Sequence, residues 1–203
     1  MASINLKFLK RINTKQSAEV AEEIIGMYKN HGGEEYAGEK ISQLEHMVQS
    51  AQLAAQQGYD EEVILAAFLH DIGHICVSAH GDQSMNGFGV KNHEEIGADF
   101  LKEKGFSKKV VRLVESHVEA KRYLTYKYPE YYDQLSAASK KTLEYQGGIM
   151  GQDEAEAFEQ YPLFDLIIKM RRWDEEAKIE NMPVPNLEYY KSMMVMHLQK
   201  QNN

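Results

Sequence analysis

Apolar positions recur at intervals of three and four residues along most of the chain, the pattern of amphipathic helices. The predicted helices cover about residues 17–30, 42–57, 61–73, 92–104, 107–122 or beyond, 136–145, 153–160, 163–177 and 187–199. No alternating apolar and polar run is long enough to predict a strand. The pattern therefore predicts an all-α fold.

Capping residues mark where several of these helices begin. Ser42 and Glu45 have the spacing of a capping box, and Asn92 and Glu95 repeat it. Asp60 precedes the third helix and is expected to cap it. These signals fix the register of the helices that carry the candidate chemistry.

Two segments are expected to be irregular. The stretch VSAHGDQSMNGFGVK is rich in Gly, Ser and Asn and predicts a long loop, and residues 126–132 predict a Tyr-rich connection with one proline. We find no repeat, low-complexity segment or linker, and 203 residues suit one domain of ordinary size. We therefore predict a single domain over residues 1–203.

Composition and charge narrow the classes of function. The net charge of −8 argues against a nucleic-acid partner, because binding phosphate backbones needs clustered Lys and Arg. It still allows a local basic site for a small anion. Cys76 is the single cysteine, which favours a reducing compartment. No run of 18 apolar residues and no secretory signal is present, so we predict a cytoplasmic protein with no membrane partner.

The sequence FLHDIGHI holds the first candidate site residues. His70 and Asp71 are adjacent within an apolar helix, where both are costly to bury without a partner. A metal ion would be such a partner, and His74 follows His70 by four residues, on the same helical face. The His-Asp pair alone is a weak signal. For any one of these histidines, a hydrogen bond to a carbonyl is the simpler interpretation.

Four further ionisable residues lie at or beside helix faces that we expect to be buried: His46, His93, His117 and Asp174. With His70 and Asp71 they make four histidines and two aspartates. This set suits two divalent ions, with one aspartate able to bridge them. Nitrogen and carboxylate ligands favour Fe, Mn or Zn over Ca or Mg.

The remaining histidines and Trp173 are weaker candidates. His31 lies in a turn, His197 in a largely polar helix, and His80 in the loop, where it is expected to be solvated. Trp173 is expected to belong to the core.

The order of the six candidate ligands resembles that of the two-metal members of the HD-domain superfamily. Within it, the sequence is similar to the diiron oxygenases, above all to those that cleave 2-amino-1-hydroxyethylphosphonate to glycine and phosphate. The resemblance covers about residues 36–191, the expected core of the domain. The matching stretches are YAGEKISQLEH, LAAFLHDIGH, GFGVKNHEEIGADFL, SHVEAKRYL, LSAASKKTLEYQGG and RRWDEEAK. Metal binding does not require EYQGG or HVEAKRYL, so these two stretches indicate a shared substrate pocket.

The resemblance implies how the metals are held. His46, His70 and Asp174 would bind one iron, His93 and His117 the other, and Asp71 would lie between them. The expected cofactor is a pair of Fe ions in the Fe(II)/Fe(III) state, with Mn or Zn as the alternative. The ligand types do not choose among these metals.

The resemblance also implies roles for residues that are not ligands. Tyr36 would occupy the open position on the second iron until substrate displaces it. Glu39 would move with Tyr36 and meet the substrate amine, and His74 would lie near the substrate hydroxyl. The residues expected around the phosphonate are Lys121, Ser139, Thr142, Gln146 and Arg171. Without the resemblance, Lys121 and Arg171 are equally well explained as surface charges, and Tyr36 and Glu39 as a solvated loop.

The function that the resemblance implies is a non-haem diiron oxygenase. It would cleave the C–P bond of a small 1-hydroxyphosphonate with O2, giving phosphate and a carboxylic acid. The main alternative is a metal-dependent HD phosphohydrolase acting on a small phosphate ester or nucleotide, in which the two metals activate water. A third interpretation, a degenerate HD domain that only binds, is disfavoured because all six ligand positions are filled. Sequence alone leaves open whether the substrate amine is free or methylated, and the oligomeric state.

Overall fold

The computed structural model describes residues 6–36, 38–78 and 90–201. These residues form eleven α-helices and no strand, which confirms the predicted all-α fold. The helices are α1 (Leu6–His31), α2 (Gln43–Gln56), α3 (Glu61–Leu69), α4 (Ile72–Ser78), α5 (His93–Glu103), α6 (Lys108–Lys127), α7 (Pro129–Gln134), α8 (Ala137–Tyr145), α9 (Gln152–Glu159), α10 (Phe164–Glu176) and α11 (Glu188–Gln201). An isolated antiparallel bridge joins Glu35 and Ser42 in the connection between α1 and α2.

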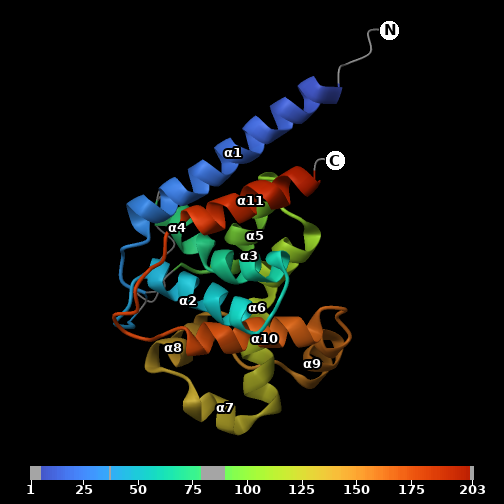
Figure 1. The fold of residues 1–203 in the computed structure, drawn as a ribbon. Coiled ribbons are helices and arrows are strands. Elements are labelled where there is room, and N and C mark those ends of the chain that lie inside the picture. Colours follow the sequence, from blue (N-terminus) through green and yellow to red (C-terminus); the bar gives the residue numbers. More distant parts are fainter. Residues whose placement is uncertain (1–5, 37, 79–89, 202–203) are drawn as a thin grey trace.

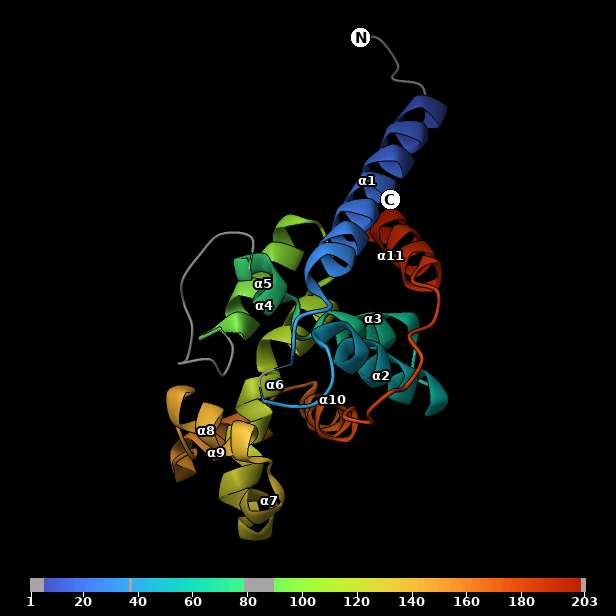
Figure 2. The same cartoon turned by 90° about the vertical axis from the view of Figure 1, so that its left-hand side faces the viewer.

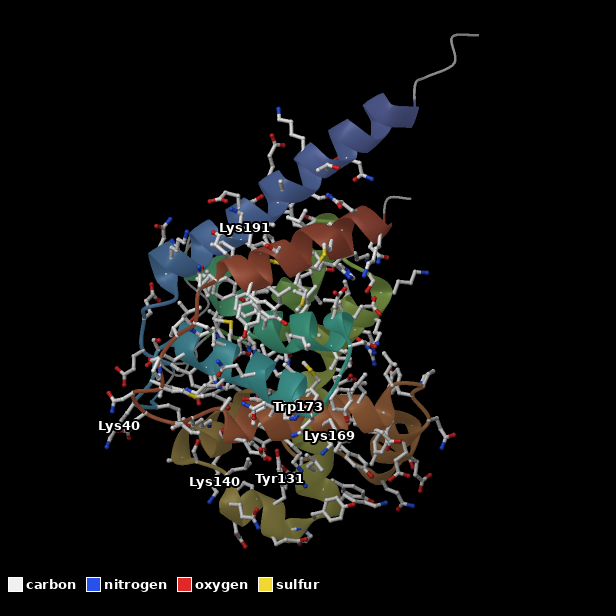
Figure 3. The ribbon with its side chains drawn as sticks, in the orientation of Figure 1. Lys40, Tyr131, Lys140, Lys169, Trp173 and Lys191 are labelled. Atoms are coloured by element: carbon white, nitrogen blue, oxygen red, sulfur yellow. The ribbon has the colours of Figure 1, made fainter. Side chains whose placement is uncertain are left out.

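The helices pack in two groups around α3 and α6 (Figure 1). Helices α2, α3, α6 and α10 pack against one another, and α4 and α5 form a pair of which α5 contacts α6. Helices α1 and α11 lie side by side, with α11 against α3 (Figure 2). Helices α7, α8 and α9 lie at the other end of the molecule from α1. Trp173 on α10 is 1% exposed and belongs to the apolar core, as predicted (Figure 3). No helix in the described ranges is both long enough and apolar enough to cross a membrane.

Two of the three predicted helix caps are confirmed. Ser42 Oγ accepts a hydrogen bond from the Glu45 amide at 3.2 Å while the Ser42 amide donates to Glu45 Oε2 at 2.7 Å, which completes the capping box. The Asp60 side chain accepts from the Val63 amide, as expected. The second capping box is wrong, because Asn92 takes a left-handed conformation with φ of 58° and its side chain makes no capping hydrogen bond.

The predicted helix over residues 61–73 is interrupted at His70 and Asp71. Helix α3 ends at Leu69 and α4 begins at Ile72, so Asp71 lies in the turn between them. The reason lies in the packing of α4 on α5: a Cβ atom on Gly73 would lie 1.9 Å from the His93 carbonyl oxygen. This close backbone contact requires glycine and sets the direction of α4. The turn lets the adjacent His70 and Asp71 face the same point.

Other boundaries differ from the prediction in smaller ways. Residues 126–132 are not a connection, because α6 continues to Lys127 and α7 begins at Pro129, a favourable first position for proline. Helix α1 begins at Leu6. Helix α4 continues to Ser78, two residues into the predicted loop, and residues 79–89, including His80, lie outside the described residues.

Candidate metal centre and adjoining cavity

Four buried histidines share one orientation. In each, Nδ1 points away from the centre and Nε2 points into it. Each Nδ1 contacts a backbone carbonyl: His46 with Ala177 (2.9 Å), His70 with Ala67 (2.9 Å), His93 with Val90 (3.2 Å) and His117 with Val114 (2.7 Å). A carbonyl can only accept, so each Nδ1 carries a hydrogen and donates it. The backbone thereby fixes the tautomer that leaves Nε2 free to bind a metal.

The four Nε2 atoms meet in two pairs. His46 and His70 are 3.1 Å apart at Nε2, and His93 and His117 are 3.0 Å apart. Two nitrogen lone pairs at this distance repel each other unless a cation lies beside them. A metal ion held by both nitrogens of a pair would relieve this repulsion. This arrangement fits a pair of metals.

The Asp71 carboxylate lies between the two histidine pairs. Its Oδ2 is 3.6 Å from His46 Nε2 and 3.4 Å from His70 Nε2, while its Oδ1 is 3.2 Å from His93 and 3.4 Å from His117. Asp174 joins the first pair, with Oδ1 3.3 Å from His46 Nε2. The structure thus brings all six predicted ligands together, in the two groups that the resemblance implies.

The centre favours positive charge. Burial opposes ionisation of Asp71, yet contacts with His70, His117 and His93 hold its pKa well below the usual range. Arg171 and His46 do the same for Asp174 against its burial. Burial also disfavours charge on His70, but the two carboxylates raise its pKa to about 9. Two ionised carboxylates among imidazoles are suited to cations.

The hairpin before α2 covers one side of the centre. The Tyr36 amide donates to the Ile41 carbonyl at 2.8 Å, and the Glu39 amide donates to the Tyr36 carbonyl at 2.7 Å. The Tyr36 ring stacks on His46 with centroids 4.0 Å apart, and its hydroxyl lies 3.4 Å from Asp174 Oδ1. Burial and then the two nearby carboxylates raise the pKa of Tyr36 well above its usual value, so it is a neutral phenol. In this placement Tyr36 contacts the first group of ligands, and its predicted contact with the second metal stays a prediction.

A cavity of about 40 Å³ adjoins the second group of ligands. Asp71, His93 and His117 line it, as does Asp174, whereas His46 and His70 do not. All eight residues predicted for catalysis or substrate binding also line it: Tyr36, Glu39, His74, Lys121, Ser139, Thr142, Gln146 and Arg171. By this measure the cavity has room for several water molecules or a small polar ligand.

His74 reaches the cavity from α4. Its ring stacks on His93 with centroids 4.0 Å apart, and its Nδ1 accepts a hydrogen bond from the Val90 amide at 3.0 Å. Burial and the nearby His93 hold the pKa of His74 well below its usual value. Ligand atoms of His74, His93 and Asp71 lie within 4.8 Å of one another, so His74 is also placed to add a ligand to the second group.

Two buried basic side chains, Lys121 and Arg171, also line the cavity. Lys121 is 3% exposed and its Nζ donates to Thr142 Oγ1 at 2.9 Å. Burial, reinforced by Arg171, lowers the pKa of Lys121 to about 7. Arg171 donates through Nε to Tyr131 and Glu175, both at 3.0 Å, and through Nη1 to Asp174. Its Nη2 is buried with no hydrogen-bond partner among the described residues, as is Gln146 Oε1. Unpartnered polar atoms in a cavity wall are suited to a polar ligand.

Several supporting residues were missed by reading the sequence. Lys178 lines the cavity and its Nζ donates to Glu39 Oε1 at 2.7 Å. It follows Asp174 by four residues, a spacing that could have found it. Tyr131 and Glu175 hold Arg171, but Tyr131 was assigned to a connection. His197 is not on a polar face: it is 2% exposed and accepts a hydrogen bond from the Ser107 amide, which is a structural role.

Comparison with known proteins finds a matching family and relatives that align with this chain over most of its length. The model of the HD domain matches residues 44–146. An uncharacterized protein of Acanthamoeba polyphaga mimivirus is 42% identical over 94% of this chain and 87% of its own length. The 1-hydroxy-2-(trimethylamino)ethylphosphonate dioxygenase (glycine-betaine-forming) of Leisingera caerulea is 41% identical, covering 86% of this chain and 88% of its own. The hydroxymethylphosphonate dioxygenase of Gimesia maris is 37% identical, covering 87% of each. The chain therefore belongs to the HD-domain family.

Proposed function

We propose that this chain is a metal-dependent oxygenase that cleaves the C–P bond of a small 1-hydroxyphosphonate with O2. The observation that carries the proposal is the position of the cavity. It lies between a buried group of metal ligands and a wall with two cationic side chains, Lys121 and Arg171. Both named relatives are dioxygenases of hydroxyphosphonates, which supports the same reaction here.

The proposed cofactor is a pair of iron ions in the Fe(II)/Fe(III) state. Four imidazoles with fixed tautomers and two carboxylates supply ligands of the right type, although Mn or Zn would accept the same set. Asp71 would help to hold both ions, because its two oxygens face different histidine pairs. When bound, the iron pair supplies the activation of oxygen and a Lewis acid for the substrate oxygens.

The protein residues would bind and orient the substrate. Lys121 and the free Nη2 of Arg171 would hold the phosphonate oxygens by charge-assisted hydrogen bonds. Thr142, Ser139 and Gln146 line the same wall and would add neutral hydrogen bonds.

The opposite side of the cavity would receive the hydroxyl-bearing carbon. His74 is neutral there and would contact the substrate hydroxyl, while the Tyr36 phenol would fill the space until the substrate enters. Glu39 also lines the cavity and accepts a hydrogen bond from Lys178.

The reaction requires no reactant other than substrate and O2. For hydroxymethylphosphonate, the C–P bond breaks, one oxygen molecule is consumed, and formate and phosphate form with all atoms balanced. The carbon is oxidised and O2 is reduced. A phosphohydrolase would instead consume water and no oxygen.

The test is reconstitution of the protein with Fe(II) under argon, followed by addition of O2 and a panel of 1-hydroxyphosphonates. We expect one O2 consumed for each phosphate and carboxylate released, with zinc-loaded protein inactive. Phosphate release from phosphate esters without oxygen uptake would contradict the proposal and favour the hydrolase alternative. The cytoplasmic location stays a prediction.

A further inference from the structure

Glu94, the residue after His93, carries a buried carboxylate oxygen that faces the ring of this candidate metal ligand. The Glu94 side chain is 15% exposed, and its Oε2 lies 3.5 Å from His93 Nδ1. That oxygen is buried and makes no hydrogen bond within the part of the chain that the structure describes. Among the described residues, His93 is also the one partner of Glu94 at ion-pair distance. Burying a carboxylate oxygen without a hydrogen bond is costly, so its position calls for a physical reason.

The surroundings of Nδ1 distinguish His93 from the other three histidines of the centre. In those three, Nδ1 lies 2.7–2.9 Å from a backbone carbonyl. The contact of His93 with the Val90 carbonyl is longer, at 3.2 Å. Among the described residues, His93 is also the one of the four with a carboxylate oxygen within 4.0 Å of Nδ1. The hydrogen on His93 Nδ1 therefore faces two acceptors, the Val90 carbonyl and Glu94.

A carboxylate beside Nδ1 acts on a metal through the imidazole ring. A metal ion bound at Nε2 withdraws electrons from the ring and makes the Nδ1–H group a stronger donor, so the attraction of Glu94 grows when the metal binds. Such a carboxylate orients the ring and raises the basicity of the ligating nitrogen. Its negative charge also stabilises the ion more as the charge of the ion increases.

The start of α5 offers another reason for acidic residues at this place. Glu94 and Glu95 both lie in the first turn of the helix, where the helix dipole favours negative charge, and Asn92 supplies no capping hydrogen bond. Glu95 is exposed, whereas Glu94 is largely buried against His93. The dipole accounts for both residues equally and does not account for the burial of one of them. A comparison of Glu94 with Glu95 therefore separates the two explanations.

We propose that Glu94 is a positioning residue for the second metal. It orients His93, strengthens the bond of this histidine to the ion and favours the more oxidised state of the ion. Glu94 itself touches neither substrate nor metal in this role. Neither histidine of the first group has a carboxylate beside its Nδ1 among the described residues, so Glu94 makes the two positions electronically different. The inference rests on the metal pair of the proposed function and not on the identity of the substrate.

The test is metal binding by Glu94→Gln, which keeps the size of the side chain and removes its charge. The probe is Co(II), titrated calorimetrically under argon into metal-free protein. We expect the first ion to bind as in the unmodified protein and the second to bind about ten- to a hundredfold more weakly, the usual effect of removing an outer partner of a ligating histidine. In iron-loaded protein the reduction potential of the pair should rise, because the lost charge stabilises Fe(III) more than Fe(II).

Two further variants make the test decisive. Glu95→Gln is the matched control, since it removes a charge from the same turn of α5 and should change neither the affinity for the second ion nor the potential. Glu94→Asp keeps the charge but withdraws it from the ring by one methylene, so it should lose less affinity for the second ion than Glu94→Gln. If Glu94→Gln fails to fold by circular dichroism, a loss in Glu94→Asp that is absent from Glu95→Asp decides.

The outcomes separate this inference from the proposed function. An unchanged affinity for the second ion in Glu94→Gln, or equal losses in Glu94→Gln and Glu95→Gln, would overturn the role of Glu94 alone. Uptake of fewer than two ions by the unmodified protein would overturn the metal pair together with it. The expected contrast in metal binding without oxidation of any 1-hydroxyphosphonate would support the role of Glu94 and overturn the proposed reaction.

Discussion

The two groups of metal ligands have the same chemistry but different surroundings. The first group, His46, His70 and Asp174, is at most 3% exposed. The Tyr36 ring covers His46, and neither His46 nor His70 lines the cavity. In the second group, His93 and His117 both line the cavity, next to Lys121. Of the first group only Asp174 reaches the cavity, whereas both histidines of the second face the space where a substrate would lie.

The difference suggests a division of labour between the two metals. A position closed on all sides holds its ion and tunes its partner, while a position with free coordination sites exchanges ligands. Asp71 connects the two groups, since each of its oxygens faces one of them. Substitutions of Asp71, of a histidine in either group, and of residues in the cavity wall test this difference between the two groups.

Loss of the bridge should have the largest effect. Asp71→Ala removes an oxygen from both groups and leaves facing imidazoles without their carboxylate, so we expect both metals to be lost and oxygenase activity to vanish. Metal content by elemental analysis checks this. Asp99→Ala, at an exposed position on α5, is the control and should keep both ions. Retention of two ions in Asp71→Ala would show that the groups are independent.

Removing one histidine from either side should separate the two positions. His117→Ala should leave about one ion per chain, because the first group is intact and enclosed. His46→Ala should lose more, since its Nε2 lies near His70, Asp71 and Asp174 together. The measurement is metal content after dialysis against a chelator. Equal losses in the two variants would remove the distinction between a closed and an open position.

Much of this centre could be predicted from sequence because its residues carry their own signals. His70 and Asp71 are ionisable residues in an apolar stretch of sequence, and His46, His93 and His117 lie on faces with helical periodicity. Such residues are conspicuous because burying them without a partner is costly. The helices could also be predicted, because their periodicity and capping residues such as Ser42 are local features of the sequence.

The parts that were missed depend on contacts between distant segments. The break between α3 and α4 follows from the approach of Gly73 to His93, twenty residues away, which no local pattern reveals. Lys178 and Glu39 lie on separate segments, and each alone resembles a surface charge. Helix α7 was missed because its tyrosines and proline favoured an irregular connection, although proline is favourable at the first position of a helix.

The cavity wall should contribute to substrate affinity and little to metal binding. Lys121→Ala removes a buried basic side chain that donates to Thr142, so substrate affinity should fall about ten- to a hundredfold, or roughly 1.5–3 kcal/mol. Metal content should not change. A substrate analogue that lacks the phosphonate should lose much less affinity. Normal phosphonate binding by this variant would place the anion site elsewhere.

Arg171→Ala should behave differently from Lys121→Ala. Arg171 donates to Asp174, so its loss should weaken both the substrate and the ion at the first position. Metal content measured in parallel for the two variants checks this contrast. Identical metal retention would mean that the Asp174 contact does not support the ligand.

The smallest expected effect is that of removing the Tyr131 hydroxyl, which contacts Arg171. The Tyr131 hydroxyl accepts from Arg171 Nε at 3.0 Å and donates to Glu175, and it comes from α7 to meet α10 (Figure 3). Burial and Glu175 raise the pKa of Tyr131, so the phenol stays a donor to that carboxylate. Tyr131 thus orients the guanidinium whose Nη2 is free.

Tyr131→Phe should raise KM for the phosphonate about two- to tenfold, the value of one neutral hydrogen bond, with kcat nearly unchanged. The matched control is Tyr132→Phe, because Tyr132 is 39% exposed and its ring contacts only Lys140 among the interactions described for it. A fall in kcat with KM unchanged, or equal effects in the two variants, would show that Tyr131 supports the fold and not the orientation of Arg171.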